Sequence, residues 1–453
     1  MAKGKKTKEE LTSEKRLAEA LMTVAEQPHP VPENWCWTQL KWLIETSKEK
    51  TEDFSVPDVK YVGLEHIEKD IGIIGYSSTE GIKSLKNVFH AGQILYGKLR
   101  PYLNKHDVAN FDGICSTDIL VFNAKPLVLK QYINYYFSQQ NFIEYVVANS
   151  KGINLPRVSE SIVLDAPCPL PSFAEQQRIV DIIERLFAKL DEAKEKAQAV
   201  VDSFEIRKAA ILHRAFTGEL TVQWRSNNNI STDTWLQKKL SECTYAIGDG
   251  LHGTPLFSEN EDYYFINGNN FSGEMIEIKQ DTKSVDIHEF EKYRVPLSSD
   301  LTVFVSINGT LGKTAFYNGE SIILGKSACY INVSEELNKY YLRYYLWSKD
   351  FVDYANRMAT GSTIKNLGLK AMRNLLIPLP SLDEQAEIVR ILDDLLNKEQ
   401  QAKASAETVL DQIDTMKKAI LARAFRGKLG TNDPTEESSI ELLKENVRSY
   451  FHE

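Results

Sequence analysis

The chain has 453 residues, of which 42% are hydrophobic and 26% charged, and its formal net charge is −9. This length accommodates two or three domains, and no unbroken apolar stretch approaches the ~20 residues that cross a bilayer. The five cysteines lie far apart without a Cys-x-x-Cys pair, which excludes a zinc ribbon or a thiol redox motif. We therefore expect a cytoplasmic protein with small buried thiols, and the acidity gives no sign of a nucleic-acid partner.

The N-terminal residues 1–30 are expected to form a short helical segment. Met1 to Lys8 is basic but leads into Glu9 and Glu10 rather than an apolar run, so the sequence does not predict a signal peptide. Leu17, Leu21 and Val24 repeat at helical spacing and form one apolar face.

Two regions, residues 31–168 and residues 231–377, read as globular domains of mixed α/β structure. Each contains short Val, Ile, Tyr and Phe runs interrupted by glycine and asparagine, which is typical of strands and turns. Each ends in an aromatic run of helical character, 132–137 and 341–346, separated by a shift of 209 residues. Both regions are nearly neutral, and much of the acidity follows residue 378.

The strongest signal is an internal repeat of residues 169–220 at 378–429. Without a gap, 25 of 52 positions are identical, including Pro-Leu-Pro-Ser-x-x-Glu-Gln and Arg-Ala-Phe-x-Gly-x-Leu. A gapless match of this length requires a rigid element, because loops tolerate insertions. Ser172 and Ser381 stand three residues before a glutamate, the capping-box pattern, and the glycines near the far ends mark helix termination. Each copy is predicted to be one uninterrupted helix, the first from Phe173 to Phe216.

Both helices carry a heptad pattern of apolar residues, which predicts that they pair as a coiled coil. Two polar residues interrupt the pattern, Arg207 in the first helix and Glu399 in the second, and in an antiparallel pair these two need not meet. The small Ala193, Ala197 and Ala402, with Ala406, would permit close approach of the axes. The helix-pairing residues expected from the pattern are Ile179, Ile183, Leu186, Leu190, Val200, Phe204, Ile388, Leu392, Leu395, Val409 and Ile413.

The last segment, residues 430–453, is expected to be a linker followed by a short helix. Ile440, Leu443 and Val447, with Tyr450 or Phe451, lie on one helical face. This face would meet the N-terminal helix or the helix of a partner.

The paired Pro-Leu-Pro-Ser-x-x-Glu-Gln helices, each ending in Arg-Ala-Phe-x-Gly-x-Leu, resemble the repeated regions of specificity subunits of type I restriction–modification systems. The resemblance covers almost the whole chain, including 31–35 and 248–255 at the beginnings of the two globular regions. It implies an α+β fold in which two target-recognition domains, 31–168 and 221–377 with its leading linker, are separated by two long helices, 169–220 and 378–429. These helices would form an antiparallel coiled coil with a pseudo-twofold internal repeat.

The resemblance further implies a non-catalytic protein that reads a bipartite site in double-stranded DNA. The expected partners are methyltransferase subunits, two copies in the usual case, and restriction–translocase subunits, with no membrane. S-adenosylmethionine, ATP and Mg²⁺ would bind those partners, and no cofactor or metal is expected on this chain. Because the helices would hold the readers apart, their length would set the unread spacer at roughly one duplex turn.

The chain's own chemistry agrees with a non-catalytic role. It contains no Pro-Pro dipeptide, and hence no Asn/Asp-Pro-Pro-aromatic loop of amino-methyltransferases. The segment Gly309 to Thr314 resembles a phosphate-binding loop, but Ile307 stands where that loop needs its first glycine. The resemblance implies that this segment is a turn between strands of the second target-recognition domain. The eight histidines show no metal-ligand spacing.

Candidate DNA contacts come from polar loops of the two globular regions, because Arg, Asn and Lys recognise guanine, adenine and phosphate. The alternative for each of them is a solvated turn. The candidates are Lys98, Arg100, Tyr102, Asn104, Lys105, Lys151, Asn154, His252, Thr254, Asn267, Asn269, Asn270, Asn308, Thr310, Lys313, Thr363 and Lys365.

Two other functions stay open on the sequence alone. A coiled-coil scaffold without DNA binding would carry the same heptads, and a stand-alone restriction enzyme would need catalytic motifs that we do not find. The bases recognised and the spacer length do not follow from the residue types, because direct readout depends on loop geometry.

Overall fold

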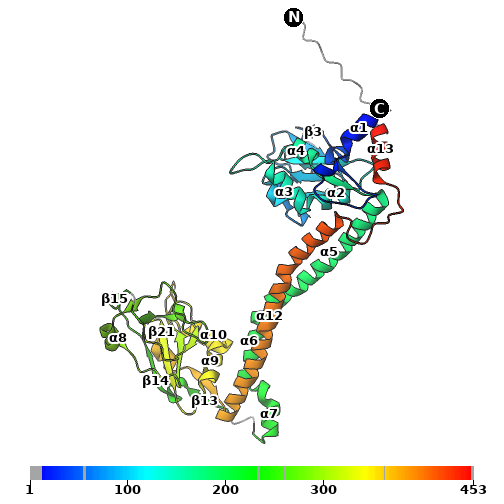
Figure 1. Ribbon diagram of the computed structural model, residues 1–453. Coiled ribbons are helices and arrows are strands. Elements are labelled where there is room, and N and C mark those ends of the chain that lie inside the picture. The colour runs from blue at the N-terminus through cyan, green and yellow to red at the C-terminus, as the bar shows by residue number, and fades with distance from the viewer. Residues whose placement is uncertain (1–12, 55–57, 232–234, 260, 362, 450–453) are drawn as a thin grey trace. The chain divides into compact units, whose positions relative to one another are not determined.

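The computed structural model describes residues 13–54, 58–231, 235–259, 261–361 and 363–449. Contacts divide the chain into two compact units: unit 1 is Met1–Lys196 with Val409–Glu453, and unit 2 is Ala197–Thr408. Each unit therefore combines one globular domain with the beginning of one long helix and the end of the other. We describe each unit by itself (Figure 1).

The core of the globular domain in unit 1 is an antiparallel four-stranded sheet backed by helices. Its strand order is β2 (Ile44–Thr46), β11 (Ile119–Ala124), β8 (Ile94–Gly97) and β9 (His106–Val108). Buried aromatic side chains of α2 (Lys130–Phe137) and α3 (Gln140–Ala148) join Tyr96 and Phe122 of this sheet in one hydrophobic cluster.

A second sheet completes the domain of unit 1. Its order is β3 (Lys50–Thr51), β7 (Lys86–Phe89), β10 (Gly113–Cys115) and β4 (Tyr61–Val62), with only β10 and β4 parallel. Two further strand pairs are β1 (Cys36–Gln39) with β12 (Pro167–Leu170), and β5 (Ile67–Glu68) with β6 (Gly72–Ile73). The short helices are η1 (Val24–Glu26), η2 (Leu40–Trp42), η3 (Leu64–His66), η4 (Pro101–Leu103) and α4 (Glu160–Asp165).

Unit 2 repeats the first sheet strand for strand. The order is β14 (Thr244–Asp249), β21 (Ala328–Val333), β18 (Thr302–Ser306) and β19 (Thr314–Phe316), and every pair is antiparallel. The closing pair also recurs, as β13 (Leu236–Lys239) with β22 (Leu376–Leu379). Helices α9 (Lys339–Trp347) and α10 (Lys349–Met358) correspond to α2 and α3 at the shift of 209. The aromatic runs predicted to be helical are confirmed as α2 and α9.

The second sheet is where the two domains diverge. In unit 2 its order is β15 (Phe257–Ser258), β17 (Ser284–Val285), β16 (Tyr263–Ile266) and β20 (Ile322–Leu324), with β16 and β20 parallel. β20 is the counterpart of β10, at the shift of 209. The antiparallel neighbour thus pairs with β10 in unit 1 but with β16, on the other side of the parallel pair, in unit 2. The remaining elements of unit 2 are η5 (Glu219–Thr221), α7 (Val222–Asn227), η7 (Leu240–Glu242), η8 (Gly268–Asn270), α8 (Ile287–Tyr293) and α11 (Leu369–Arg373).

The long helices follow the prediction with one correction. The second is continuous as α12 (Leu382–Ala424), but the first is broken into α5 (Phe173–Asp202) and α6 (Phe204–Phe216). The break lies at Ser203, whose hydroxyl donates to the Ala199 carbonyl and accepts from Arg207. A serine hydroxyl that bonds back to the preceding turn competes with the backbone and bends a helix. Absence of proline and glycine was therefore insufficient to predict continuity.

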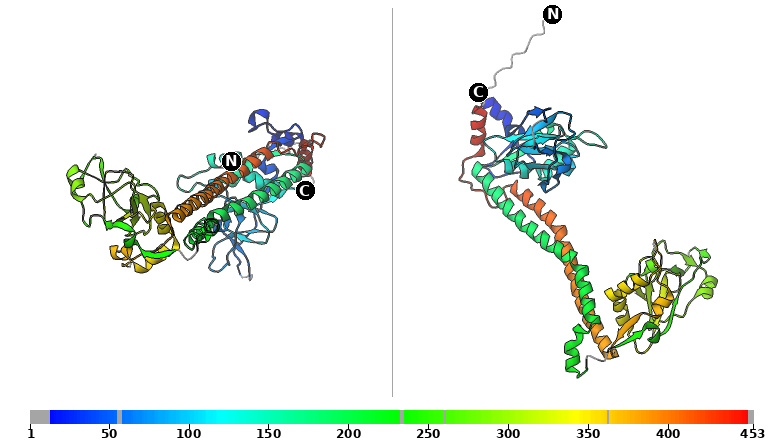
Figure 2. Two further views of the ribbon diagram at one scale, coloured as in Figure 1. Left: turned by 90° about the horizontal axis from the view of Figure 1, so that it is seen from below. Right: turned by 180° about the vertical axis from the view of Figure 1, so that it is seen from behind.

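Arg207 and Glu399 do meet, contrary to the prediction that they need not. In unit 2 the Arg207 Nε donates to a Glu399 carboxylate oxygen over 2.6 Å. Near it, Lys403 lies 4.8 Å above the Phe204 ring. Along unit 2, ascending positions of α6 thus meet descending positions of α12, which run beside each other in Figure 2. The heptad pattern of each helix, taken alone, predicts that both polar residues interrupt the apolar face. The pairing of the two residues depends on how the helices are aligned.

The predicted apolar stripe also needs one correction, at Val409. Ile179, Ile183, Phe204, Ile388, Leu392 and Ile413 are buried, and Leu186, Leu190, Val200 and Leu395 are half-buried, but Val409 is 40% exposed. After Glu399 the packed face of α12 advances by four residues to Lys403, so that it then passes through Ala406 and Leu410 instead of Val409.

The Ser-x-x-Glu motif forms only half of the predicted capping box. Ser172 and Ser381 each accept the backbone N–H three residues ahead, over 3.1 and 3.4 Å. The glutamates Glu175 and Glu384, fully buried, do not return to the cap. Glu384 instead binds Arg225, Thr221 and Trp235 in unit 2, and Glu175 binds Arg178 and Thr431 in unit 1. A buried charge needs such partners, and they override the local motif.

The adjacent glutamines dock each helix on its own globular domain. Gln176 accepts from the Leu129 backbone N–H and donates to the Leu127 carbonyl. Gln385 makes the same two bonds with Asn338 and Glu336, each shifted by 209. The repeated Glu-Gln pair is therefore a docking motif for the globular domain in both units.

The far end of each long helix packs on the globular domain that precedes the other long helix in the chain. Phe425, at the end of the second helix, lies on Tyr132 and Tyr136 of unit 1, whereas Phe216 lies on Tyr341 and Tyr345 of unit 2. The glycines predicted as helix breakers, Gly218 and Gly427, have φ of 77° and 65°. An added Cβ at Gly427 would lie 2.3 Å from Pro32, so the breaker also permits close packing.

The terminal helices meet each other within unit 1. α1 (Ser13–Ala20) contacts α13 (Ser439–Ser449), as Figure 1 shows, and Leu17, Leu21, Ile440 and Leu443 join the core there. Val24 is 86% exposed and was wrongly assigned to this face, because α1 ends at Ala20 and Val24 is the first residue of η1. The side chain of Val447, and Tyr450 and Phe451, lie outside the described residues.

The cysteines behave as predicted. All five are free and buried, and burial raises the pKa of Cys36 to about 11 and that of Cys115 to about 12. No helix in the part of the chain that the structure describes is long and apolar enough to cross a membrane.

Candidate functional site

In each globular domain the candidate loops gather at one corner, where the strand counterparts β8 and β18 end. In unit 1 a hairpin at residues 151–157 is closed by reciprocal backbone bonds between Lys151 and Arg157, of 2.9 and 2.8 Å. The loop after β8 lies against it, because the Arg100 N–H donates to the Pro156 carbonyl over 2.7 Å. Two segments separated by fifty residues of sequence thus form one surface.

Unit 2 builds the same corner with the same backbone bonds. Its hairpin at residues 360–366 is closed between Thr360 and Asn366, and the Gly309 N–H donates to the Lys365 carbonyl over 2.8 Å. Gly152 and Gly361 occupy equivalent positions in the two hairpins, with φ of 100° and 91°. These values favour glycine, so the hairpin geometry is fixed by sequence in both units.

Several predicted contact residues of unit 1 are accessible at this corner. Arg100, Tyr102, Lys151 and Asn154 are exposed, and Lys98 is half-buried. Burial lowers the pKa of Lys98, while Asp118 opposes this shift. Arg100 has φ of 49°, in the left-handed region where its counterpart is Gly309. A non-glycine residue held there is strained, and such strain concentrates at functional sites.

Two predicted contacts of unit 1 have structural partners instead. Asn104 is 2% exposed, and its amide contacts the ring of the buried His106 over 3.0 Å. The Lys105 ammonium donates to the Leu64 carbonyl over 2.6 Å. Asn104 is therefore wrongly assigned as a surface contact, because η4 turns its side chain inward, which the composition of the loop does not reveal.

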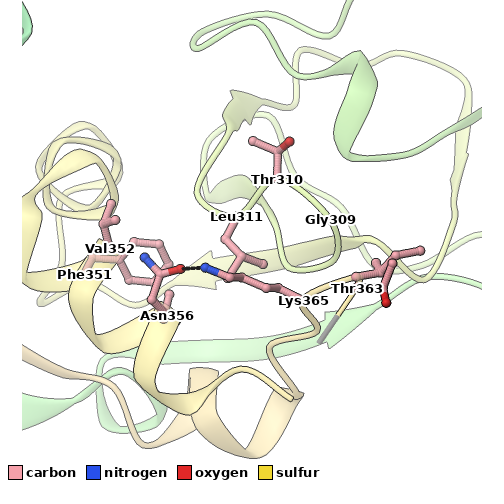
Figure 3. Close-up of a pocket in the computed structure, with 10 residues that line it drawn as sticks. Gly309, Thr310, Leu311, Phe351, Val352, Asn356, Thr363 and Lys365 are labelled. Atoms are coloured by element: carbon pink, nitrogen blue, oxygen red, sulfur yellow. Dashed lines mark hydrogen bonds between the residues drawn. The ribbon is translucent and has the colours of Figure 1, made fainter. Parts of the chain in front are cut away.

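The corner in unit 2 contains a pocket that is absent from the sequence interpretation. It lies between the turn at residues 309–311, the hairpin and α10 (Figure 3). Thr310, Thr363 and Lys365 line it, and Lys365 donates to the Asn356 side chain. Asn308 is half-buried and Lys313 is exposed beside it. In unit 1, η4 packs against α3 at the equivalent place.

The other candidate loops of unit 2 reach the same corner through residues 324–327. Leu251 bonds Leu324 and Lys326 through its backbone, and Gly268 donates to the Ser327 hydroxyl over 3.1 Å. His252, Thr254 and Asn269 are exposed, and Asn267 is half-buried. His252 contacts the Asp249 carboxylate over 2.8 Å.

Asn270 is a second wrong assignment, because it is 6% exposed. Its amide donates to the Glu277 carbonyl, and its side-chain oxygen accepts from the Asn267 backbone. Asparagine in a Gly-Asn-Asn segment is as suited to holding a turn as to reading a base, and here it holds the turn.

The place of residues 307–313 in the fold shows that this segment, which resembles a phosphate-binding loop, is not one. Residues 307–313 join the adjacent antiparallel strands β18 and β19, as predicted. A phosphate-binding loop leads into a helix, whereas this turn leads into a strand. Within the described residues no group of three His, Cys, Asp or Glu side chains is placed to hold a metal ion.

The sequence interpretation missed four accessible residues of these corners. Arg157 is exposed and donates to Asp118 over 2.7 Å. Ile153 is fully exposed on the tip of the first hairpin, beside Leu155 at 57%, and Ile364 is 64% exposed on the second. The signal was available, because Leu155 and Ile364 are separated by the same shift of 209 as the helices.

Comparison with known proteins places these features in one family. The model of the type I restriction modification DNA specificity domain matches residues 41–201 and 234–408. The EcoDI specificity subunit of Escherichia coli is 30% identical over 201 residues, which are 44% of this chain and 45% of that one. The EcoBI specificity subunit of Escherichia coli is 23% identical over 322 residues, 65% of each chain. The match thus spans less than half of the first relative's length.

The fold has solved counterparts. The crystal structure of the HsdS subunit from Thermoanaerobacter tengcongensis superposes with a TM-score of 0.67 and 20% identity, over 90% of this chain and 100% of that one. A structure titled for complex assembly and conformational transition of the type I R-M system gives 0.68 and 21%, over 89% and 100%. At these identities the likeness shows the fold.

Proposed function

Because the chain belongs to the family of type I restriction–modification DNA specificity domains, we propose that it is a non-catalytic DNA-specificity subunit that reads a bipartite site. The observation that carries the proposal is the repeated corner. Two domains keep the same first sheet and the same hairpin, yet differ in their second sheet and in the polar side chains around it. One scaffold that presents two different surfaces suits two different half-sites.

We further propose that the two long helices form an antiparallel coiled coil and relate the readers by a pseudo-twofold. Support comes from each unit separately. In unit 1 the beginning of α5 contacts residues after α12, through Arg178 and Thr431, while Asp191 further along contacts Lys417. In unit 2 the same opposed order links Arg225 with Glu384 and Arg207 with Glu399. The domain division would be 31–168 and 221–377 for the readers and 169–220 and 378–429 for the helices.

The proposed partners are double-stranded DNA, two methyltransferase subunits and restriction–translocase subunits. S-adenosylmethionine, ATP and Mg²⁺ would be bound by those subunits. The DNA-contacting side chains would be the accessible candidates at the two corners, with Arg157 added and Asn104 and Asn270 removed. The acidic net charge is consistent with DNA affinity that depends on partner subunits.

The decisive experiment is to express the full chain with its neighbouring methyltransferase and to map the methylated bases across a genome. The expected result is a split motif with a fixed gap. A continuous motif, or methylation that does not depend on this chain, would contradict the proposal.

The spacer provides a second test. Seven residues, about two helical turns, are inserted into both α5 and α12 at facing positions. The gap of the methylated motif should lengthen while both half-sites stay the same, and insertion into one helix alone should abolish methylation. The alternative, a coiled-coil scaffold that does not bind DNA, predicts no sequence-dependent footprint from either protein.

A further inference from the structure

The two hairpin tips expose apolar side chains that no described contact explains. Ile153 is 100% exposed and Leu155 57% exposed on the first hairpin, which projects between α3 and α4 in Figure 1. On the second hairpin Ile364 is 64% exposed. Leu155 and Ile364 occupy equivalent positions, so this exposure occurs in both domains although their second sheets differ.

Backbone hydrogen bonds of the described residues hold both hairpins. Each hairpin is closed by two backbone bonds, and each carries a left-handed glycine whose added Cβ would lie 3.0 Å from the Leu155 carbonyl oxygen or 2.4 Å from the Ile364 carbonyl oxygen. A further backbone bond fixes each hairpin to the loop after the central strand, through Pro156 or Lys365. Ile153 and Leu155 lie two residues apart on the first tip, and grouped apolar side chains rimmed by polar residues mark sites where a partner binds.

The charge around the tips identifies the kind of partner. The first tip is flanked by exposed Arg100, Lys151 and Arg157, and among the described residues only Arg157 has an acidic partner, Asp118. The second has Lys365 next to the tip and exposed Lys313 in the adjoining turn. Apolar side chains surrounded by cations suit duplex DNA, where the cations meet phosphates and the apolar group enters between bases.

We propose that Leu155 and Ile364 are wedges that enter the duplex and unstack one base step in each half-site, with Ile153 enlarging the first wedge. The inference rests on the proposed function and adds the mode of binding. It explains why the tips are alike in readers of different sequences: each half-site offers a base for methylation, and a base must leave the stack before it can be methylated. The shared wedge would unstack the base step in both half-sites, and the variable loops would recognise the base sequence of each one.

The test uses the full chain assembled with its methyltransferase and a duplex carrying the mapped site. 2-Aminopurine replaces successive bases of each half-site, because its fluorescence rises when it is unstacked. Wild-type protein should give one bright step in each half-site. Leu155→Ala should remove the bright step from one half-site only and Ile364→Ala from the other, each with about a tenfold loss of affinity.

Two controls separate a wedge from other roles. Val24→Ala in unit 1 and Ile287→Ala in unit 2 remove similarly exposed apolar groups away from the corners, and both should bind as wild type. A mismatch at the bright step, which is already unstacked, should restore the affinity of the matching variant.

Unchanged fluorescence in both variants would overturn the wedge while leaving a split methylation motif, and hence the proposed function, intact. Loss of methyltransferase co-purification without loss of the bright step would overturn it in favour of a protein-docking surface. Absence of any split motif with wild-type protein would instead contradict the proposed function itself.

Discussion

The two globular domains differ in a graded way, from almost none beside the long helices to a different strand order in the second sheet. Closest to the long helices they are almost interchangeable: Gln176 and Gln385 make the same backbone bonds, and the first sheets have the same strand order. At the corner the backbone is kept while side chains change, as Arg100 and Gly309 illustrate. In the second sheet even the strand order changes.

This gradient shows that the docking of each globular domain on its long helix is kept more strictly than the outer surface of the domain. Under the proposed function, equal docking contacts would present both half-sites alike, and the outer sheet and loops would vary with the DNA sequence.

The largest difference is expected for the buried glutamates. Glu384→Ala should lower the free energy of unfolding by about 4 kcal/mol, because it leaves Arg225, 5% exposed, without its buried partner. Glu175→Ala should cost about 2 kcal/mol, because Arg178 is 38% exposed and keeps Glu436. Urea unfolding monitored by tryptophan fluorescence measures both. Adding Arg225→Ala to Glu384→Ala should restore part of the loss, and equal losses in the two single variants would contradict the assignment of unequal partners.

Equal losses of stability are expected when the phenylalanine at the end of either long helix is replaced. Phe216→Ala and Phe425→Ala should each cost about 3 kcal/mol, because each ring packs between two tyrosines of a globular domain. Thermal unfolding should show the same shift for both variants. Phe173→Ala and Leu382→Ala, at exposed equivalent positions of the same repeat, are the matched controls and should have little effect. A difference of more than about twofold between Phe216 and Phe425 would show that the repeat is not energetically equal.

At the corner the same backbone position should respond with opposite signs. Gly309→Ala should destabilise by about 1 kcal/mol, because φ of 76° strains any side chain although no atom lies within 4 Å of the added Cβ. Arg100→Gly should stabilise by about 0.5 kcal/mol through relief of the left-handed strain. The same variant should weaken DNA binding, since it removes an exposed cation. Circular dichroism melts and binding titrations distinguish the two effects; a destabilised Arg100→Gly variant would show that the side chain has a structural role.

Features that repeat along the chain could be predicted from the sequence. Features that depend on contacts between distant residues could not. The repeat, the aromatic helices and the helix-ending glycines followed from spacing and residue type alone, whereas the turn at residues 307–313 followed from the family resemblance. The break at Ser203 depends on a side chain bonding to its own helix, and the Arg207–Glu399 pair depends on the register between two helices. Burial of Asn104 and Asn270 required the fold, since a polar residue in a loop sequence can face either way.

The smallest expected effect concerns acid sensitivity in unit 1, where two carboxylates share Arg178. Hydrogen bonding to Arg178 lowers the pKa of Glu436, whereas burial raises the pKa of Glu175. A lowered folded-state pKa contributes stability that is present at neutral pH and is lost as pH falls through the lowered value. Glu436→Gln should therefore remove less than about 1 kcal/mol at pH 7 and flatten the loss of stability below pH 5.

The raised pKa of Glu175 has the opposite sign, because its ionised form is disfavoured by burial; its contribution declines as pH rises through the raised value. Urea midpoints measured from pH 3 to pH 8 separate the two carboxylates. Glu437→Gln, at an exposed neighbouring position, is the control. Its urea midpoint should fall below pH 5 as steeply as that of the wild type. Unit 2 has no counterpart of this arrangement at the equivalent position, where Glu387 replaces Arg178. If the urea midpoint of Glu436→Gln falls with pH below pH 5 as steeply as that of the wild type, other groups cause the acid sensitivity. The Arg178 cluster would then only position the chain.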